Sequence, residues 1–273
     1  MMRKAFTITE LLVAVGLLAV VLTISGVVFS YSIDAQRAST AQAEIMRNLR
    51  AITDQLNADF AGHYPSGGVF RGFDPANAPG PYRADSIGFF TTGNFQTTNL
   101  YNNDVKGNLA WIYYGQSKSP DYTATDLKGM RNKILVRRQT IITSDMTLGS
   151  MDSSWENREY KQGVFFEIIA DYDANQSDWL DEWGCRPDDV NDVNDFSMYL
   201  VKGVGNFSVQ FYKEIDPNGT IKWWPDSDEG DFPINYNNQP YPYRAIKFNF
   251  TLYDSDGIIK DGKRFEHIVY LKQ

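Results

Sequence analysis

The first thirty residues constrain this chain more than any other stretch. A basic start at Arg3 and Lys4 is followed by Phe6 and then by an apolar run without charge over residues 11–29. At about 1.5 Å rise per residue, a helix over this run reaches across roughly 28 Å, close to the thickness of the hydrocarbon layer of a membrane. The run therefore predicts one transmembrane helix. Because the positive charges precede it, we expect the amino terminus in the cytoplasm and the rest of the chain on the other side.

Glu10 is a single carboxylate at the edge of this apolar run. An ionisable group costs about 2.5–3.5 kcal/mol at the middle of a bilayer and less at its edge, so its presence calls for a function and a partner. An ordinary secretory signal has an apolar region of about 7–15 residues before a cleavage site of small residues, and this run is longer. A plain single-pass anchor fits the length but leaves Glu10 unexplained.

The start of the chain resembles the class III signal of type IV pilins and type II secretion pseudopilins. The residues that carry this resemblance are Phe6, Glu10, Leu11 and Leu12, with the apolar run after them. In that family a prepilin peptidase cuts before a phenylalanine and N-methylates it, and the fifth mature residue is a glutamate. The resemblance implies cleavage between Ala5 and Phe6, methylation of Phe6 and an assembly role for Glu10. Ala5 stands in place of the usual glycine, and Thr9 in place of an aliphatic residue.

The spacing of Phe6 and Glu10 has a physical reason in such a family. In a filament whose core is made of these helices, the new amino terminus at Phe6 is a buried positive charge. A glutamate one helical turn further on, in a neighbouring subunit or in the same one, neutralises that charge. Buried charges persist when they are paired, so we interpret the two groups as one device for register and recruitment.

The helix is predicted to continue beyond the membrane. Apolar or small residues recur at spacings of three and four: Ala35, Ala38, Gln42, Ile45, Leu49, Ile52, Leu56 and Phe60. This is one stripe of an amphipathic helix, and Gly62 and Pro65 end it. We therefore expect a leader at 1–5, a transmembrane or filament-core helix at 6–30 and an amphipathic continuation at 31–61. The whole helix would be about 80 Å long.

Residues 62–273 are predicted to form one exported, β-rich head. Aromatic residues make up 14% of the chain, with sixteen tyrosines, and turn-forming residues recur throughout the head. The expected strands lie at 109–114, 134–142, 164–170, 197–201, 207–212, 245–253 and 265–271. Residues 64–101, rich in proline and glycine, are expected to be a loop-dominated insertion. The predicted fold class is α+β: a long amino-terminal helix packed on an antiparallel β-sheet head, as in pilins.

Net charge, cysteine content and the absence of catalytic motifs narrow the functions that this sequence predicts. The net charge of −8 argues against nucleic acid as a partner. Cys185 is the only cysteine, so no intrachain disulfide can form. Neither a nucleophile elbow nor a transition-metal pair is present, and the two histidines, His63 and His267, are expected to be ordinary residues of a helix-end loop and a strand. The sequence therefore does not predict an enzyme.

The carboxyl-terminal elements carry a second resemblance. It rests on 207–212, a hairpin, the pair Trp223 and Trp224, the segment 243–248 and the closing segment 264–271. This order resembles the J-type minor pseudopilins of type II secretion and also suits the W-type minor pilins of type IV pilus systems. A bulky head is more easily placed at a filament tip than repeated along the shaft.

One acidic segment has the spacing of a calcium loop. Oxygen-bearing side chains stand at loop positions one, three, five and seven, and a glutamate at twelve: Asp171, Asp173, Asn175, Ser177 and Glu182. This resembles the EF-hand loop. Two departures favour a solvated acidic loop instead, because Gln176 stands where the sharp turn needs glycine and Asp178 replaces an aliphatic residue. Calcium and simple solvation therefore both remain open.

Taken with these features, the resemblance implies a minor pseudopilin-like subunit, in the bacterial inner membrane by a single pass, with a periplasmic or extracellular head. The expected partners are the prepilin peptidase, other minor and major pilin-like subunits and the inner-membrane assembly platform. Assembly at or near the tip of a short periplasmic filament would drive type II protein secretion. The alternatives are a minor pilin of a type IV pilus or competence system, and a membrane-anchored exported binding domain that never polymerises.

Overall fold

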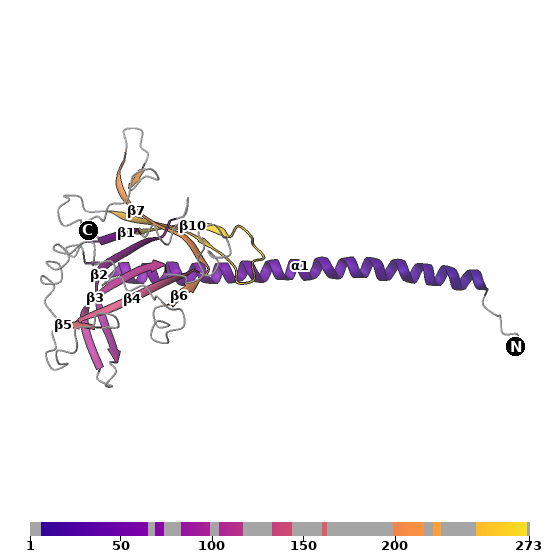
Figure 1. The fold of residues 1–273 in the computed structure, drawn as a ribbon, viewed down its shortest axis with the longest axis horizontal. Coiled ribbons are helices and arrows are strands. Elements are labelled where there is room, and N and C mark those ends of the chain that lie inside the picture. Colours follow the sequence, from indigo (N-terminus) through magenta and orange to yellow (C-terminus); the bar gives the residue numbers. More distant parts are fainter. Residues whose placement is uncertain are drawn as a thin grey trace.

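The computed structural model describes residues 7–64, 69–73, 83–98, 104–116, 133–143, 160–162, 199–215, 221–224 and 244–271. One helix, α1 (Ile8–Ala61), runs without interruption for 54 residues. Its first half projects away from the β-structure and its second half lies against it (Figure 1). The predicted long helix is thus confirmed.

The head covers α1 only from Ala41 onward. Five apolar side chains on this part of the helix are buried: Ala41, Ile45, Ile52, Leu56 and Phe60. Leu49 is half-buried, and the three earlier positions of the predicted stripe, at 35, 38 and 42, are exposed. The predicted stripe thus packs on the head over its later positions, from Ile45 onward. The side chains at positions 35, 38 and 42 are small or polar and offer little apolar area to bury.

The first sheet has six strands. Its members are β1 (Val69–Phe73), β2 (Asp85–Thr98), β3 (Asp104–Gln116), β4 (Ile134–Thr143), β5 (Tyr160–Gln162) and β6 (Tyr199–Lys202). The first four pair in sequence order as an antiparallel meander. On the far side of β4, β5 pairs in parallel at one end and β6 pairs antiparallel at the other.

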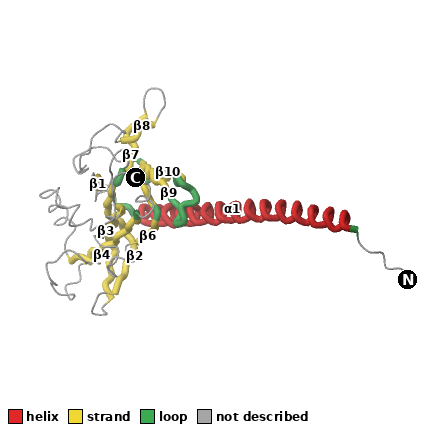
Figure 2. Tube along the Cα trace, turned by 45° about the vertical axis from the view of Figure 1, so that its right-hand side comes forward, coloured by secondary structure: helices red, strands yellow, loops and turns green. Residues whose placement is uncertain are grey.

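The second sheet has four antiparallel strands in the order β10-β9-β7-β8. They are β7 (Val204–Ile215), β8 (Ile221–Trp224), β9 (Ala245–Leu252) and β10 (Lys263–Tyr270). Figure 2 shows this sheet and the first sheet gathered at the same end of α1. The fold class is therefore α+β, with one long helix and two largely antiparallel sheets.

Six predicted strands agree with observed ones, and 164–170 lies outside the described residues. The interpretation of 64–101 as a loop-dominated insertion is wrong, because β1 and all of β2 lie there. The strand β2 carries a run of aromatic and β-branched residues that favours a pleated, half-buried surface. Glycines and prolines on either side of that run obscured it in the sequence.

One hydrophobic core joins the helix to both sheets. Phe60, near the end of α1, stacks on Phe89 of β2 with ring centroids 3.8 Å apart and lies 5.8 Å from Phe248 of β9. The inner faces of the sheets supply the rest, including Ile112 of β3 and Phe211 of β7. The head and the last third of the helix therefore share a core.

Candidate assembly helix and its attachment to the head

The amino-terminal half of α1 exposes an unbroken apolar surface. Among the described residues, fifteen large apolar side chains between Ile8 and Tyr31 are exposed. By length and composition, this helix is sufficient to cross a membrane, although a signal sequence would meet the same criterion. An apolar surface of this size requires lipid or other protein around it.

Glu10 forms a capping box with Thr7 at the start of α1. The Thr7 backbone N–H and its hydroxyl both donate to Glu10 Oε2, each at 2.9 Å. In return the Glu10 backbone N–H donates to Thr7 Oγ1 at 3.3 Å. These bonds satisfy amide groups that have no partner inside the helix. The cap was overlooked in the sequence, although Thr7 and Glu10 have the spacing of a capping box.

The capping box directs the Glu10 carboxylate back toward Thr7, at the amino end of the helix. A negative charge in the first turn also interacts favourably with the helix dipole. Among the described residues, Oε1 of Glu10 accepts no hydrogen bond, since both side-chain bonds from Thr7 go to Oε2. Within the part of the chain that the structure describes, Thr7 therefore binds only one of the two carboxylate oxygens.

A buried charged cluster fixes the other end of α1 to the first sheet. Arg137 of β4 donates from Nε and Nη2 to the two carboxylate oxygens of Asp59, both at 2.7 Å. Tyr114 of β3 donates its hydroxyl to Asp59 Oδ2, and Gln55 Nε2 donates to Oδ1 at 3.1 Å. The bidentate pair is a strong, direction-specific contact. Burial raises the pKa of the Tyr114 phenol, and the nearby Asp59 carboxylate raises it further.

Backbone contacts continue this attachment just after the helix. The Thr91 hydroxyl of β2 donates to the Asp59 carbonyl at 2.7 Å, and the Thr92 N–H donates to the Gly62 carbonyl at 2.7 Å. A Cβ at Gly62 would lie 2.1 Å from the Thr92 carbonyl oxygen, so only glycine allows this approach. The end of α1 is thus hydrogen-bonded directly to β2.

Two further contacts tie α1 to the second sheet. Glu44 accepts hydrogen bonds from the Ser255 N–H at 3.3 Å and from its hydroxyl at 3.1 Å, in the loop between β9 and β10. The buried Asp254 carboxylate shapes that loop by accepting two backbone N–H bonds, from residues 258 and 259. Further along, Nε2 of His267 on β10 lies 3.0 Å from Asn57 Oδ1. The helix is therefore held by both sheets.

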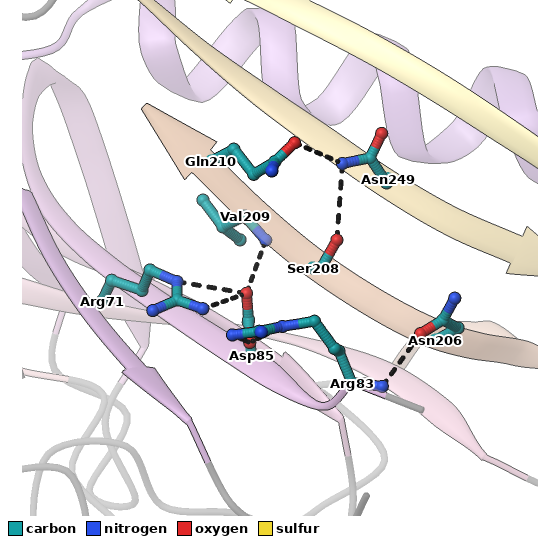
Figure 3. Close-up of polar contacts among 8 residues, drawn as sticks. All are labelled: Arg71, Arg83, Asp85, Asn206, Ser208, Val209, Gln210 and Asn249. Atoms are coloured by element: carbon teal, nitrogen blue, oxygen red, sulfur yellow. Dashed lines mark hydrogen bonds and ion pairs between the residues drawn. The ribbon is translucent and has the colours of Figure 1, made fainter. Parts of the chain in front are cut away.

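A second buried carboxylate joins the two sheets to each other (Figure 3). Asp85, at the start of β2, accepts from Arg71 Nη2 at 2.7 Å and from the Val209 N–H of β7 at 2.7 Å. Its other oxygen accepts from Arg83 Nη2 at 3.2 Å. Nearby, the Arg83 N–H donates to Asn206 Oδ1 at 2.9 Å. Burial raises the pKa of the Asp85 carboxyl, while the two guanidinium groups oppose that shift.

The imidazole of His63 is packed against the end of the helix. Its ring centroid lies 6.1 Å from those of Phe60 and Phe89. Within the described part of the chain, neither ring nitrogen has a hydrogen-bond partner. Burial lowers the pKa of His63 to about 4, so the ring is neutral at pH 7.

His63 is expected to make the head less stable in acid. Its pKa in the folded chain lies below the ordinary value of 6.5, so the unfolded chain binds more protons between pH 6.5 and pH 4. From pH 7 to pH 5, the free energy of unfolding should fall by about 2 kcal/mol more in the wild type than in His63→Phe. Urea unfolding of both proteins at the two pH values measures this difference. His267 is kept in both proteins. If the free energy of unfolding depends on pH in the same way in both, the lowered pKa of His63 is contradicted.

Most of the residues singled out in the sequence lie outside the described part of the chain. This is true of the cleavage pair, Ala5 and Phe6, and of the whole calcium candidate loop: Asp171, Asp173, Asn175, Ser177 and Glu182. Among the residues that the structure does describe, no group of three or more metal-ligating side chains is arranged to hold an ion. Glu10 alone is placed, at the exposed start of α1.

The sequence analysis missed Asp59 and Asp85, the buried carboxylates that pair with arginines. Asp59 stands three residues after Leu56, on the buried side of α1. A charge at such a position is a usable signal, because acidic residues are seldom fully buried without a partner. Asp85 follows an arginine two residues earlier but has no periodic signal of its own.

No family model, curated protein or solved structure matches this chain.

Proposed function

We propose that this chain is a pilin-like filament subunit, most like the minor pseudopilins of type II secretion. The observation that carries the proposal is the uninterrupted helix α1, apolar and uncovered in its first half and locked to a β-rich head in its second. Such a helix suits two environments in turn. It spans the lipid as a monomer and packs among neighbouring helices in a filament.

Glu10 supplies the chemistry for entering the filament. Its carboxylate lies at the amino end of the helix, with one oxygen held by Thr7. After cleavage before Phe6, the new ammonium would be attached one residue before Thr7. Burying that ammonium among apolar helices requires a counter-charge. Glu10 of the same or an adjacent subunit provides one.

The attachment of the head suits transmission of force. The buried Asp59–Arg137 pair and the shared core hold α1 against both sheets. Movement of the helix along the filament axis would therefore move the head with it. We propose that the bulky head sits at or near the filament tip, and that growth from the inner membrane pushes cargo outward. A non-polymerising anchored domain would use Glu10 only to cap the helix.

The first test is processing between Ala5 and Phe6. Intact-mass analysis of the protein purified from bacterial membranes containing a prepilin peptidase should show loss of residues 1–5 and gain of one methyl group on Phe6. An Ala5→Gly variant is the matched control and should be cleaved at least as completely. A mature start near Ser30 would instead identify a conventional signal peptide, and an uncut chain would identify a plain anchor.

A further inference from the structure

The helix α1 begins at a defined point, just after the proposed cleavage bond. Thr7 is its N-cap residue, with a φ of −84° and a ψ of 150°, so the backbone of Thr7 is extended and α1 starts at Ile8. The Leu11 N–H donates to the Thr7 carbonyl at 3.2 Å. The bond between Ala5 and Phe6 therefore precedes α1 in the sequence.

The residues before Thr7 include no type that breaks a helix. Residues 1–5 are Met, Met, Arg, Lys and Ala, which are all among the strongest helix formers. Neither glycine nor proline occurs in the first fifteen residues. Once a helix exists, each added residue gains a hydrogen bond without a new nucleation cost. The composition of the leader would therefore allow α1 to continue through it.

The capping box replaces the hydrogen bonds that such a continuation would make. In a longer helix, the Phe6 carbonyl would accept the Glu10 N–H and the Arg3 carbonyl would accept the Thr7 N–H. In the structure, the Thr7 hydroxyl accepts the Glu10 N–H at 3.3 Å, and Glu10 Oε2 accepts the Thr7 N–H at 2.9 Å. The box thus satisfies both amides without further helix.

A helix that covered the cleavage site would protect the bond. If α1 continued to Ala5, the Ala5 carbonyl would accept the N–H of Thr9. Hydrolysis develops negative charge on that carbonyl oxygen, and a peptidase has to stabilise the charge with donors of its own. An oxygen that is already bonded within a helix is poorly placed for those donors. The point at which α1 begins therefore controls access to the bond.

We infer that Thr7 is a positioning residue for the processing step, because its capping hydroxyl stops α1 short of the bond between Ala5 and Phe6. This inference rests on the proposed function and assigns a further residue to it. Thr7 acts through the backbone of the first turn, by holding the Glu10 N–H. It sets the conformation in which the leader meets the peptidase.

The test compares two substitutions of Thr7 in the full-length chain in detergent micelles, with Arg3, Lys4 and Ala5 kept. Thr7→Val keeps the shape of the side chain and removes the cap, whereas Thr7→Asn keeps a cap without a hydroxyl. Thr7 lies about 50 Å along α1 from Ala41, where the head begins, so neither change reaches the head (Figure 1).

The first measurement is the initial rate of cleavage by a purified prepilin peptidase, followed by intact mass. Thr7→Val should be cut about fivefold more slowly than the wild type, which converts to the roughly 1 kcal/mol that an N-cap contributes. Thr7→Asn should restore the rate to within about twofold of the wild type, because asparagine is as good an N-cap as threonine.

The second measurement is hydrogen exchange of the Ile8 and Thr9 amides by NMR in the same micelles. These amides have no acceptor within α1 as it stands, but a longer helix would bond them to the Lys4 and Ala5 carbonyls. In Thr7→Val their exchange should slow by the same factor as cleavage, because both rates follow the fraction of chains in which the helix begins at Ile8. Thr7→Asn should exchange like the wild type.

Three outcomes contradict the inference, and one of them also contradicts the proposed function. Equal cleavage of the wild type and Thr7→Val overturns the inference alone. The same holds if Thr7→Asn is cut as slowly as Thr7→Val, or if cleavage slows without a change in exchange, because the peptidase then recognises the Thr7 side chain itself. If the wild type is not cut at all, the proposed function fails together with the inference.

Discussion

Replacing Asp59 by alanine is expected to lower the free energy of unfolding by about 3–5 kcal/mol. The change leaves the Arg137 guanidinium and the Tyr114 hydroxyl without their shared acceptor inside the head. The Asp59 side chain is only 6% exposed and that of Arg137 only 19%, so water replaces the lost bonds poorly. Urea unfolding of the detergent-solubilised full-length protein, followed by tryptophan fluorescence, measures the loss.

Two further variants separate the charge from the position. Asp54→Ala removes an exposed carboxylate from the same helix and should change the free energy of unfolding by less than about 1 kcal/mol. Replacing Asp59 and Arg137 together by leucine should cost less than the two single changes added, because no buried charge is left unpaired. A loss below 1 kcal/mol for Asp59→Ala would show that the cluster does not hold the helix to the head.

The strands with a clear period of two were predictable from sequence. Phe248, Phe250 and Leu252 alternate with polar residues, and the structure buries all three in the core. The turn after β9 was predictable as well, since Gly257 adopts a φ of 68° that glycine accepts readily. These features depend on neighbours in sequence, which is why the sequence determines them.

Contacts between distant residues were not predictable. Asp59 meets Tyr114 and Arg137, which lie 55 and 78 positions away along the chain. Nothing in the local pattern around Arg137 distinguishes a buried arginine from an exposed one on a strand. Likewise, the extent of the head along α1 depends on where the sheets end and not on the helix period, so the burial limit at Ala41 appears only in the structure.

At the start of α1, too, one feature was predicted from the sequence and another was not. The importance of Glu10 follows from one carboxylate beside an apolar run, which is a local signal. Its capping partner Thr7 was overlooked, although a threonine three residues before a glutamate is the ordinary form of a capping box. That omission matters, because two different roles for Glu10 now have to be separated: closing the helix end and supplying a negative charge.

Replacing Glu10 by glutamine is expected to abolish assembly while the head stays folded. Glutamine can still accept from the Thr7 N–H, so the capping box is kept and only the charge is lost. About 46 Å of helix separates Glu10 from Ala41, where the head begins, so the unfolding curve of the head should be unchanged. Cross-linking between Val20 positions of adjacent subunits is the measure of assembly.

The size of this effect follows from the cost of an unpaired buried charge. Leaving the Phe6 ammonium without a counter-charge among apolar helices costs about 3–5 kcal/mol, which corresponds to a fall of more than a hundredfold in assembly. Asp34→Asn, which neutralises a carboxylate just beyond the apolar segment, should leave cross-linking unchanged. If Glu10→Gln assembles normally while Glu10→Ala does not, the function of Glu10 is to cap the helix, because only the capping contact distinguishes these two variants.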